Sequence, residues 1–204
     1  KQTLGKLAYG APGELGSSDA PPGVQLTLDA LYALATAADL QNRYDAQSLL
    51  SFRAGEGKKI YNSALDSRVL GQQMIEAVDS GDFRWTVCRL LTSVGLSRSG
   101  ADPMELLQRG IEDLETAQLV NSDRFLSLSA IGLVELLRES SGLRSFVRML
   151  DQRGSAELSM VSSLESPRGQ LLLVWHLDED PPRVTLIHDE RGEVGRFLLE
   201  KYLS

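Results

Sequence analysis

The segment QLLLVWHL, residues 170–177, decides the fold class of this chain of 204 residues. Its apolar side chains occupy consecutive positions, which predicts a central strand that is buried on both faces. Asp178–Pro182 contains two prolines and predicts a turn. Arg183–His188 is then expected to pair back as the next strand, and AELSMVSSL, residues 156–164, alternates with the period of a preceding strand.

Upstream of these strands the apolar residues recur with the helical period instead. Thr27 is expected to cap a helix over residues 28–41, and a second, short helix is expected over Asp45–Phe52. Asp102 and Pro103 have the residue types of a helix start. Further helices are predicted over residues 63–78, 83–94, 103–119, 130–138 and 143–151, the helix 130–138 being capped by Ser129.

Together these patterns predict an α+β fold. A mainly helical body is expected over residues 24–150, and a three-stranded antiparallel meander with a C-terminal helix over 151–204, the two parts sharing a core. The residues expected to form the buried side of that last helix are Val194, Phe197, Leu198 and Tyr202. Residues 1–23 are expected to be a flexible N-terminal segment, because residues 10–23 are rich in Gly, Pro, Ser and Ala.

The region 103–137 has a distinctive order of helix, short polar hairpin and helix. It carries Leu119–Val120 before the hairpin, and Leu128–Ser129 and Gly132 after it. This order resembles the second half of a winged-helix domain. The resemblance implies a recognition helix at Met104–Leu119 and a wing at Asn121–Leu128, and therefore suggests DNA binding.

The charge of the predicted recognition helix favours a different partner. Its outward face carries four acids and one arginine, whereas a DNA-reading helix gains affinity from Lys and Arg against phosphates. The whole chain has a formal net charge of −7, which also disfavours nucleic acid. We therefore expect the segment to be a protein-binding or a purely structural module, and this face to be its protein contact. Its residues are Glu105, Gln108, Arg109, Glu112, Asp113 and Glu115.

Two basic clusters are the candidate anion or partner contacts. The first lies in RAGEGKK, residues 53–59, which lacks the Gly-x-x-x-x-Gly-Lys-Ser/Thr spacing of a phosphate-binding loop. The second follows Gly142. The residues of the two clusters are Arg53, Lys58, Lys59, Arg144, Arg148 and Arg153.

Catalytic and metal-binding motifs are not apparent. The two histidines, His176 and His188, are expected opposite Val184 and Leu172, more than about 10 Å apart and too far to share a zinc ion. Cys88, the single cysteine, lies in an apolar segment and is expected to be a core residue. No cofactor, metal or catalytic residue is predicted.

The sequence leads to one principal hypothesis and two alternatives. The chain is expected to be a non-enzymatic, cytoplasmic interaction protein, such as an adaptor, assembly factor or chaperone-like subunit of a larger complex, with another protein or a second copy as partner. The first alternative is a winged-helix transcriptional regulator that contacts phosphates through the basic clusters. The second is an enzyme with paired carboxylates. No run of residues is long and apolar enough to predict a membrane span.

Overall fold

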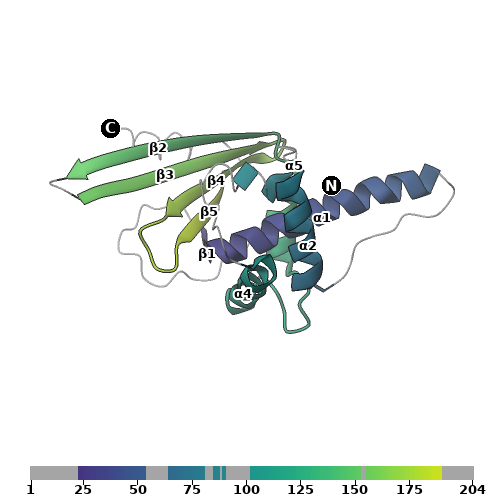
Figure 1. Cartoon of the computed structure of the whole chain (residues 1–204). Coiled ribbons are helices and arrows are strands. Elements are labelled where there is room, and N and C mark those ends of the chain that lie inside the picture. The colour runs from purple at the N-terminus through teal and green to yellow at the C-terminus, as the bar shows by residue number, and fades with distance from the viewer. Residues whose placement is uncertain are drawn as a thin grey trace.

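A computed structural model describes residues 23–53, 64–80, 85–87, 89–90, 102–152 and 155–189. Within these ranges the side chains of 47–53, 144, 146–152 and 155–159 are not described. The chain is α+β, with long helices packed against an antiparallel sheet (Figure 1). The expected N-terminal segment, apart from Gly23, lies outside the described residues, as do Cys88 and the predicted C-terminal helix.

The sheet has five strands in the order β1-β5-β4-β3-β2, all of them antiparallel to their neighbours. The predicted strand QLLLVWHL is in β4, the central strand, and Leu171–Trp175 are buried on both faces. The strands are β1 (Val24–Thr27), β2 (Gly142–Gln152), β3 (Ser155–Ser166), β4 (Gly169–His176) and β5 (Arg183–Asp189).

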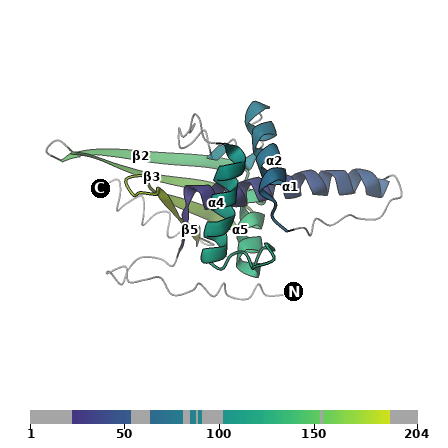
Figure 2. The same ribbon diagram turned by 60° about the horizontal axis from the view of Figure 1, so that its bottom comes forward.

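The prediction of three strands was wrong, because it missed the two edge strands of the sheet. Residues 143–151, predicted as a basic helix, belong to β2, which pairs with β3 from Gly142↔Glu165 to Gln152↔Ser155. β1 was not predicted, and it pairs with β5 from Val24↔Leu186 to Thr27↔Arg183. The paired hairpin of β2 and β3 extends beyond β4 and β5 (Figures 1 and 2).

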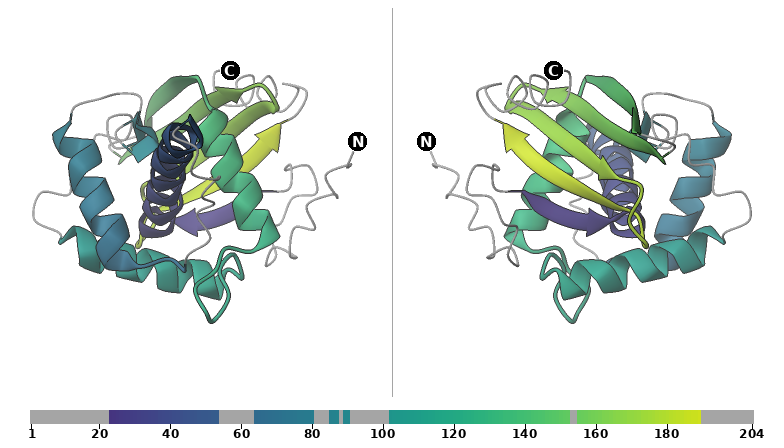
Figure 3. Two further views of the ribbon diagram at one scale, coloured as in Figure 1. Left: turned by 90° about the vertical axis from the view of Figure 1, so that its right-hand side faces the viewer. Right: turned by 90° about the vertical axis from the view of Figure 1, so that its left-hand side faces the viewer.

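The principal described helices are α1 (Leu28–Arg53), α2 (Ser67–Asp79), α4 (Pro103–Thr116) and α5 (Leu128–Glu139). α1 is one continuous helix, although two helices were predicted, since no Gly or Pro interrupts it between residues 41 and 45. Every residue from Leu28 to Leu40 is buried. α1 is therefore the central helix of the core, and Figure 3 shows it almost end-on with the sheet and the other helices around it.

Side chains cap the starts of these helices as short polar residues usually do. Thr27 Oγ1 accepts from the N–H of Ala30 at 3.2 Å, and Asp102 accepts from the N–H of Met104 at 3.0 Å, as predicted for both. The cap of α5 is Ser127, which accepts from the N–H of Ala130, so the prediction of Ser129 was two residues late.

The largest apolar cluster joins the helices to one face of the sheet. It includes Leu31 and Leu34 of α1, Leu107 and Ile111 of α4, and Leu173 of β4. A smaller cluster lies on the opposite face of the sheet and consists of Val161, Leu172, Val174 and Ile187. In the part of the chain that the structure describes, no helix is both long and apolar enough to cross a bilayer.

Candidate functional site

The six residues of the predicted protein-contact face on α4 do not all face solvent. Arg109 Nε donates to Asp29 Oδ2 at 2.9 Å, and Asp113 Oδ2 accepts from Thr27 Oγ1 at 2.5 Å. Both side chains therefore stabilise the junction of α4 with the start of α1. The helical pattern showed that these residues share a face, but it carried no signal that this face meets β1 and α1.

Of the other four residues, Glu105 and Glu112 are exposed, as is Arg109 itself, whereas Gln108 and Glu115 are half-buried. Glu105 and Gln108 line a shallow groove of about 430 Å³ between α4 and the start of α2. Gln108 also donates to Glu112 at 2.7 Å, and Glu115 forms an ion pair of 3.9 Å with Arg124. The complete lining of the groove is Ser67, Arg68, Met104, Glu105, Gln108 and Arg109.

A tight hairpin connects α4 to α5, at about the position in the chain where the sequence suggested a wing (Figure 3). Its ladder is a single bridge between Val120 and Leu126, so it is not an extended wing. Asn121 Oδ1 accepts from the N–H groups of Asp123 and Phe125, at 3.1 and 2.9 Å. Arg124 has a φ of 65°, a left-handed conformation that the turn imposes.

Three large apolar side chains lie exposed at this hairpin and at the start of α5. Phe125 is 38% exposed, Leu128 87% and Ile131 43%. We call these three residues the apolar patch. Their neighbours Leu126, Ala130 and Leu133 pack inward, so the phase of α5 directs Leu128 and Ile131 to the outside.

Sequence reasoning missed the apolar patch, although a signal was present. Ala130, Leu133, Val134 and Leu137 form the buried stripe of α5. A helical wheel drawn on that stripe places Leu128 and Ile131 away from it. The prediction treated the whole segment as core, and it started the helix at Ala130, which removed Leu128 from the helix altogether.

The described side chains do not test whether the two basic clusters form contact surfaces. Lys58, Lys59 and Arg153 lie outside the described residues, and Arg53 is the last residue of α1 without a described side chain. The backbones of Arg144 and Arg148 belong to strand β2, where they pair with Ser163 and Ser159. The prediction that these two arginines share a helix was therefore wrong.

The two histidines are far apart along neighbouring strands. His176 pairs with Arg183, and His188 pairs with Leu171, so the predicted register was wrong by one residue. Five positions of the ladder separate them, which corresponds to about 17 Å at about 3.4 Å per residue. His176 Nε2 makes a hydrogen bond of 2.9 Å with Thr185 Oγ1. Each imidazole therefore has a separate local environment.

Asp39 is a buried carboxylate that sequence reasoning did not identify. It is 1% exposed on α1, and it accepts from the N–H groups of Thr86 and Val87 at 2.7 and 2.9 Å. Burial raises its pKa, although these hydrogen bonds and the nearby Arg89 act in the opposite direction. Arg89 also donates to Ser140 O at 3.0 Å. These contacts join α1, the segment 85–90 and the end of α5, and they indicate a structural role.

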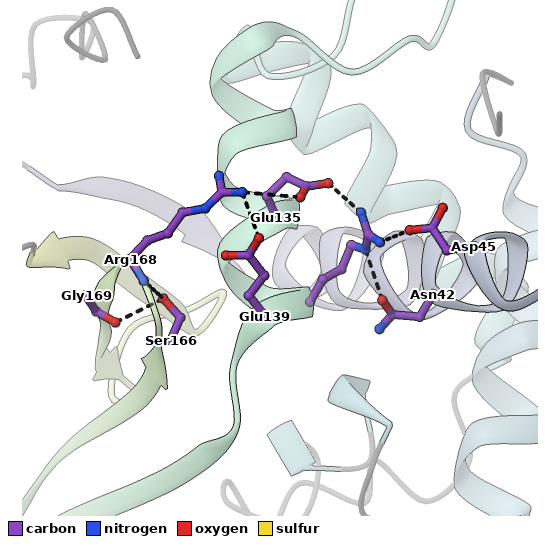
Figure 4. Close-up of polar contacts among 8 residues, drawn as sticks. Asn42, Asp45, Glu135, Glu139, Ser166, Arg168 and Gly169 are labelled. Atoms are coloured by element: carbon purple, nitrogen blue, oxygen red, sulfur yellow. Dashed lines mark hydrogen bonds and ion pairs between the residues drawn. The ribbon is translucent and has the colours of Figure 1, made fainter. Parts of the chain in front are cut away.

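A second polar network joins the sheet to α1 and α5 (Figure 4). Arg138 of α5 donates to Asn42 Oδ1 at 3.0 Å and to Glu135 at 2.5 Å, and it also pairs with Asp45. Arg168, in the turn between β3 and β4, pairs with Glu139 at 2.7 Å. Each carboxylate in this network forms an ion pair with Arg138 or Arg168, so the network presents no unpaired charge to a ligand.

The described residues contain no group of three His, Cys, Asp or Glu side chains that could hold a metal ion. Comparison of the chain with family models, with curated proteins and with solved structures found no significant match. The candidate site is therefore the surface formed by the apolar patch and the adjacent end of α4.

Proposed function

We propose that this chain is a non-enzymatic interaction protein of the cytoplasm, an adaptor, assembly factor or chaperone-like subunit of a larger complex. The observation that carries the proposal is the apolar patch. Single exposed leucines are common on proteins, but Leu128 is 87% exposed, and Phe125 and Ile131, each three residues from it in the sequence, are exposed as well. Exposed apolar groups that gather in one place are typical of protein-contact surfaces.

The construction of the surface supports the same proposal. Five hydrogen bonds fix the hairpin, including Asn121 N to Phe125 O at 3.0 Å and Ser127 N to Leu119 O at 2.8 Å. A partner would meet side chains that are already held in place, so less conformational entropy would be lost on binding. The acidic residues at the end of α4 would form a polar rim around the apolar contact.

Site-specific photo-crosslinking in cells tests the proposal. A benzophenone side chain at position 128 is expected to capture a discrete protein, whereas the same group at position 78 is not. Val78 is the control, because it is an apolar residue that is 47% exposed on α2 and lies outside the apolar patch. Equal capture at both positions, or purification of the chain alone as a monomer with no adduct at position 128, would contradict the proposal.

A winged-helix regulator that binds DNA is the second candidate. It is favoured by the order α4, hairpin, α5, and by Leu65 N, which donates to Arg124 O at 2.9 Å and adds a third chain segment beside the hairpin. The exposed acids of α4, such as Glu105 and Glu112, would repel phosphates. Contacts would have to come from the basic clusters listed above.

Fluorescence anisotropy with a labelled random-sequence duplex distinguishes the two candidates. The interaction protein is expected to give no binding even at low salt. Binding at low salt that weakens steeply as salt increases, and that is lost when Arg144 and Arg148 are changed to Glu, would favour the regulator instead.

A further inference from the structure

We propose that the apolar patch binds a positively charged amphipathic helix of a partner protein. This inference rests on the proposed function, because it takes the apolar patch as the contact surface and adds the chemistry of the partner. Two observations lead to it: the spacing of the apolar side chains and the charge around them.

The spacing of the apolar side chains matches one face of a helix. Leu128 and Ile131 are three residues apart on α5, so they project from the same side, and Phe125, three residues before Leu128 in the hairpin, is also exposed. A partner helix that places its own apolar residues at i, i+3, i+4 and i+7 can pack along such a row. The next side chain on this side of α5, beyond Gly132, is Glu135, which already pairs with Arg138, so the apolar row ends there.

The charge around the apolar patch selects a basic partner. The last two turns of α4 contribute Glu112 and Glu115, and the hairpin contributes Asp123, whereas the carboxylate of Asp113 is bound to Thr27 at the junction with α1. These three acids are accompanied in the same elements by one base, Arg124, which pairs with Glu115 at 3.9 Å. Lys or Arg beside the apolar stripe of a partner would meet favourable charge here, whereas acidic residues would be repelled.

The same charge disfavours a second copy of this chain as the occupant. If two apolar patches met face to face around a twofold axis, each would bring its acidic rim toward the other. The repulsion would oppose the small apolar area that three side chains can bury. A basic helix from another protein has no such cost.

The test measures binding of two labelled peptides to the full chain by fluorescence anisotropy. The first is a helical peptide of about 14 residues, roughly four turns, with Leu at i, i+3, i+4 and i+7 and Lys elsewhere. The second has Glu in place of every Lys. The wild-type chain is expected to bind the Leu/Lys peptide and to bind the Leu/Glu peptide at least about tenfold more weakly.

Two matched variants locate the binding. Leu128→Ser is expected to weaken binding of the Leu/Lys peptide by about tenfold or more, because it removes the most exposed apolar side chain of the patch. Val78→Ser, which removes an apolar side chain that is 47% exposed on α2, is expected to leave binding unchanged. Both sites are exposed, so neither variant should affect folding. Asp123→Asn combined with Glu115→Gln is expected to weaken binding by about threefold at low salt and by less at high salt.

Each contrary result has a distinct meaning. Equal binding of both peptides, still dependent on Leu128, would overturn the basic partner but leave the apolar patch as a contact surface. If Leu128→Ser does not weaken binding of the Leu/Lys peptide, this inference is overturned. The proposed function is tested separately, by the crosslinking at position 128. A dimer that depends on Leu128 would assign the patch to a second copy. If removal of residues 1–23 greatly increased the affinity for the peptide, the apolar patch would be the binding site of the chain's own N-terminal segment. Either result overturns the inference.

Discussion

The backbone of Gly110 in α4 lies directly against the backbone of Asp29 in α1: a Cβ atom at Gly110 would be 2.2 Å from the carbonyl oxygen of Asp29. No side chain can adjust to relieve such a contact, because the opposing atom belongs to the backbone. The close approach also brings Arg109 and Asp113 within reach of Asp29 and Thr27. The packing of α4 on α1 therefore depends on a residue without a side chain.

Gly110→Ala is expected to destabilise the chain by about 2–4 kcal/mol, because α4 must move away from α1. Gly71→Ala on α2 is the matched control. A Cβ there would lie 2.8 Å from Met104 Cγ, the side chain of which is flexible and 43% exposed. The gain in helix propensity should offset much of that cost, so a change within about 1 kcal/mol is expected. Urea unfolding followed by circular dichroism measures both, and similar effects at the two glycines would contradict the packing described.

Asp39→Asn is expected to destabilise the chain, because an amide cannot accept from both Thr86 N–H and Val87 N–H with its two terminal atoms. We expect a loss of about 1–3 kcal/mol. The loss should depend on pH. Burial raises the folded-state pKa of Asp39 above its ordinary value of 3.8, so the folded chain binds this proton more tightly than the unfolded chain.

The stabilisation linked to that proton is complete below about pH 3.8 and is lost as the pH rises through the raised pKa. The difference in unfolding free energy between wild type and Asp39→Asn should therefore decrease from pH 4 upward. Urea titrations at several pH values between 4 and 8 measure this difference. A difference that stayed constant, or that increased with pH, would show that burial is not the dominant influence on the pKa of Asp39.

Arg138→Met is expected to cost about 1–3 kcal/mol, since its guanidinium, 15% exposed, makes charge-assisted hydrogen bonds that join α5 to α1. Arg183→Met is the matched control. Arg183 is 46% exposed and pairs with Glu179 at 3.6 Å, so its loss should change stability by less than about 0.5 kcal/mol. Chemical unfolding at low and high salt measures both variants. If high salt abolished the effect of Arg138→Met, the network would be a screened surface interaction instead of a buried one.

Ser162→Ala is expected to cost about 1–3 kcal/mol, because Ser162 Oγ accepts from the buried Trp175 Nε1 at 2.9 Å. The hydroxyl of Ser145 also lies 2.9 Å from Ser162 Oγ, but Ser145 is exposed and can bond to water. Ser145→Ala should therefore cost less than about 1 kcal/mol. Thermal unfolding and tryptophan fluorescence compare the two. Equal losses would indicate that the indole N–H has another acceptor once Ser162 is changed.

Local sequence patterns correctly predicted the helices and strands whose structure depends mainly on their own residues. β4 has five consecutive buried apolar residues, and α4 begins at Asp102–Pro103 as its residue types indicated. The fold class followed from such segments. Residues 143–151 were assigned to a helix because LRSFVRML has apolar residues at spacings that suit either period, and pairing with β3 decides the outcome. β1 has four residues, and it is a strand because β5 lies beside it.

The candidate site was less predictable than the fold. The acidic face of α4 was identified as a set, yet Arg109 and Asp113 turned out to contact the start of α1, a segment about 80 residues earlier in the chain. The buried environment of Asp39 also arises from residues distant in sequence, since Thr86 and Val87 approach from another element. Exposure of Leu128 depends on where α5 begins, and the start of a helix is the part of it that sequence patterns locate least well.

The pairing of β1 with β5 has a consequence for how the chain folds during synthesis. Val24 pairs with Leu186, so the ribosome must add some 160 residues after β1 before its partner exists. At about 5–20 residues per second this takes roughly 8–30 s. Until β5 has been made, the first half of α1, buried in the finished protein, lacks part of the sheet against which it packs. The nascent chain must therefore hold an apolar helix without its complete cover.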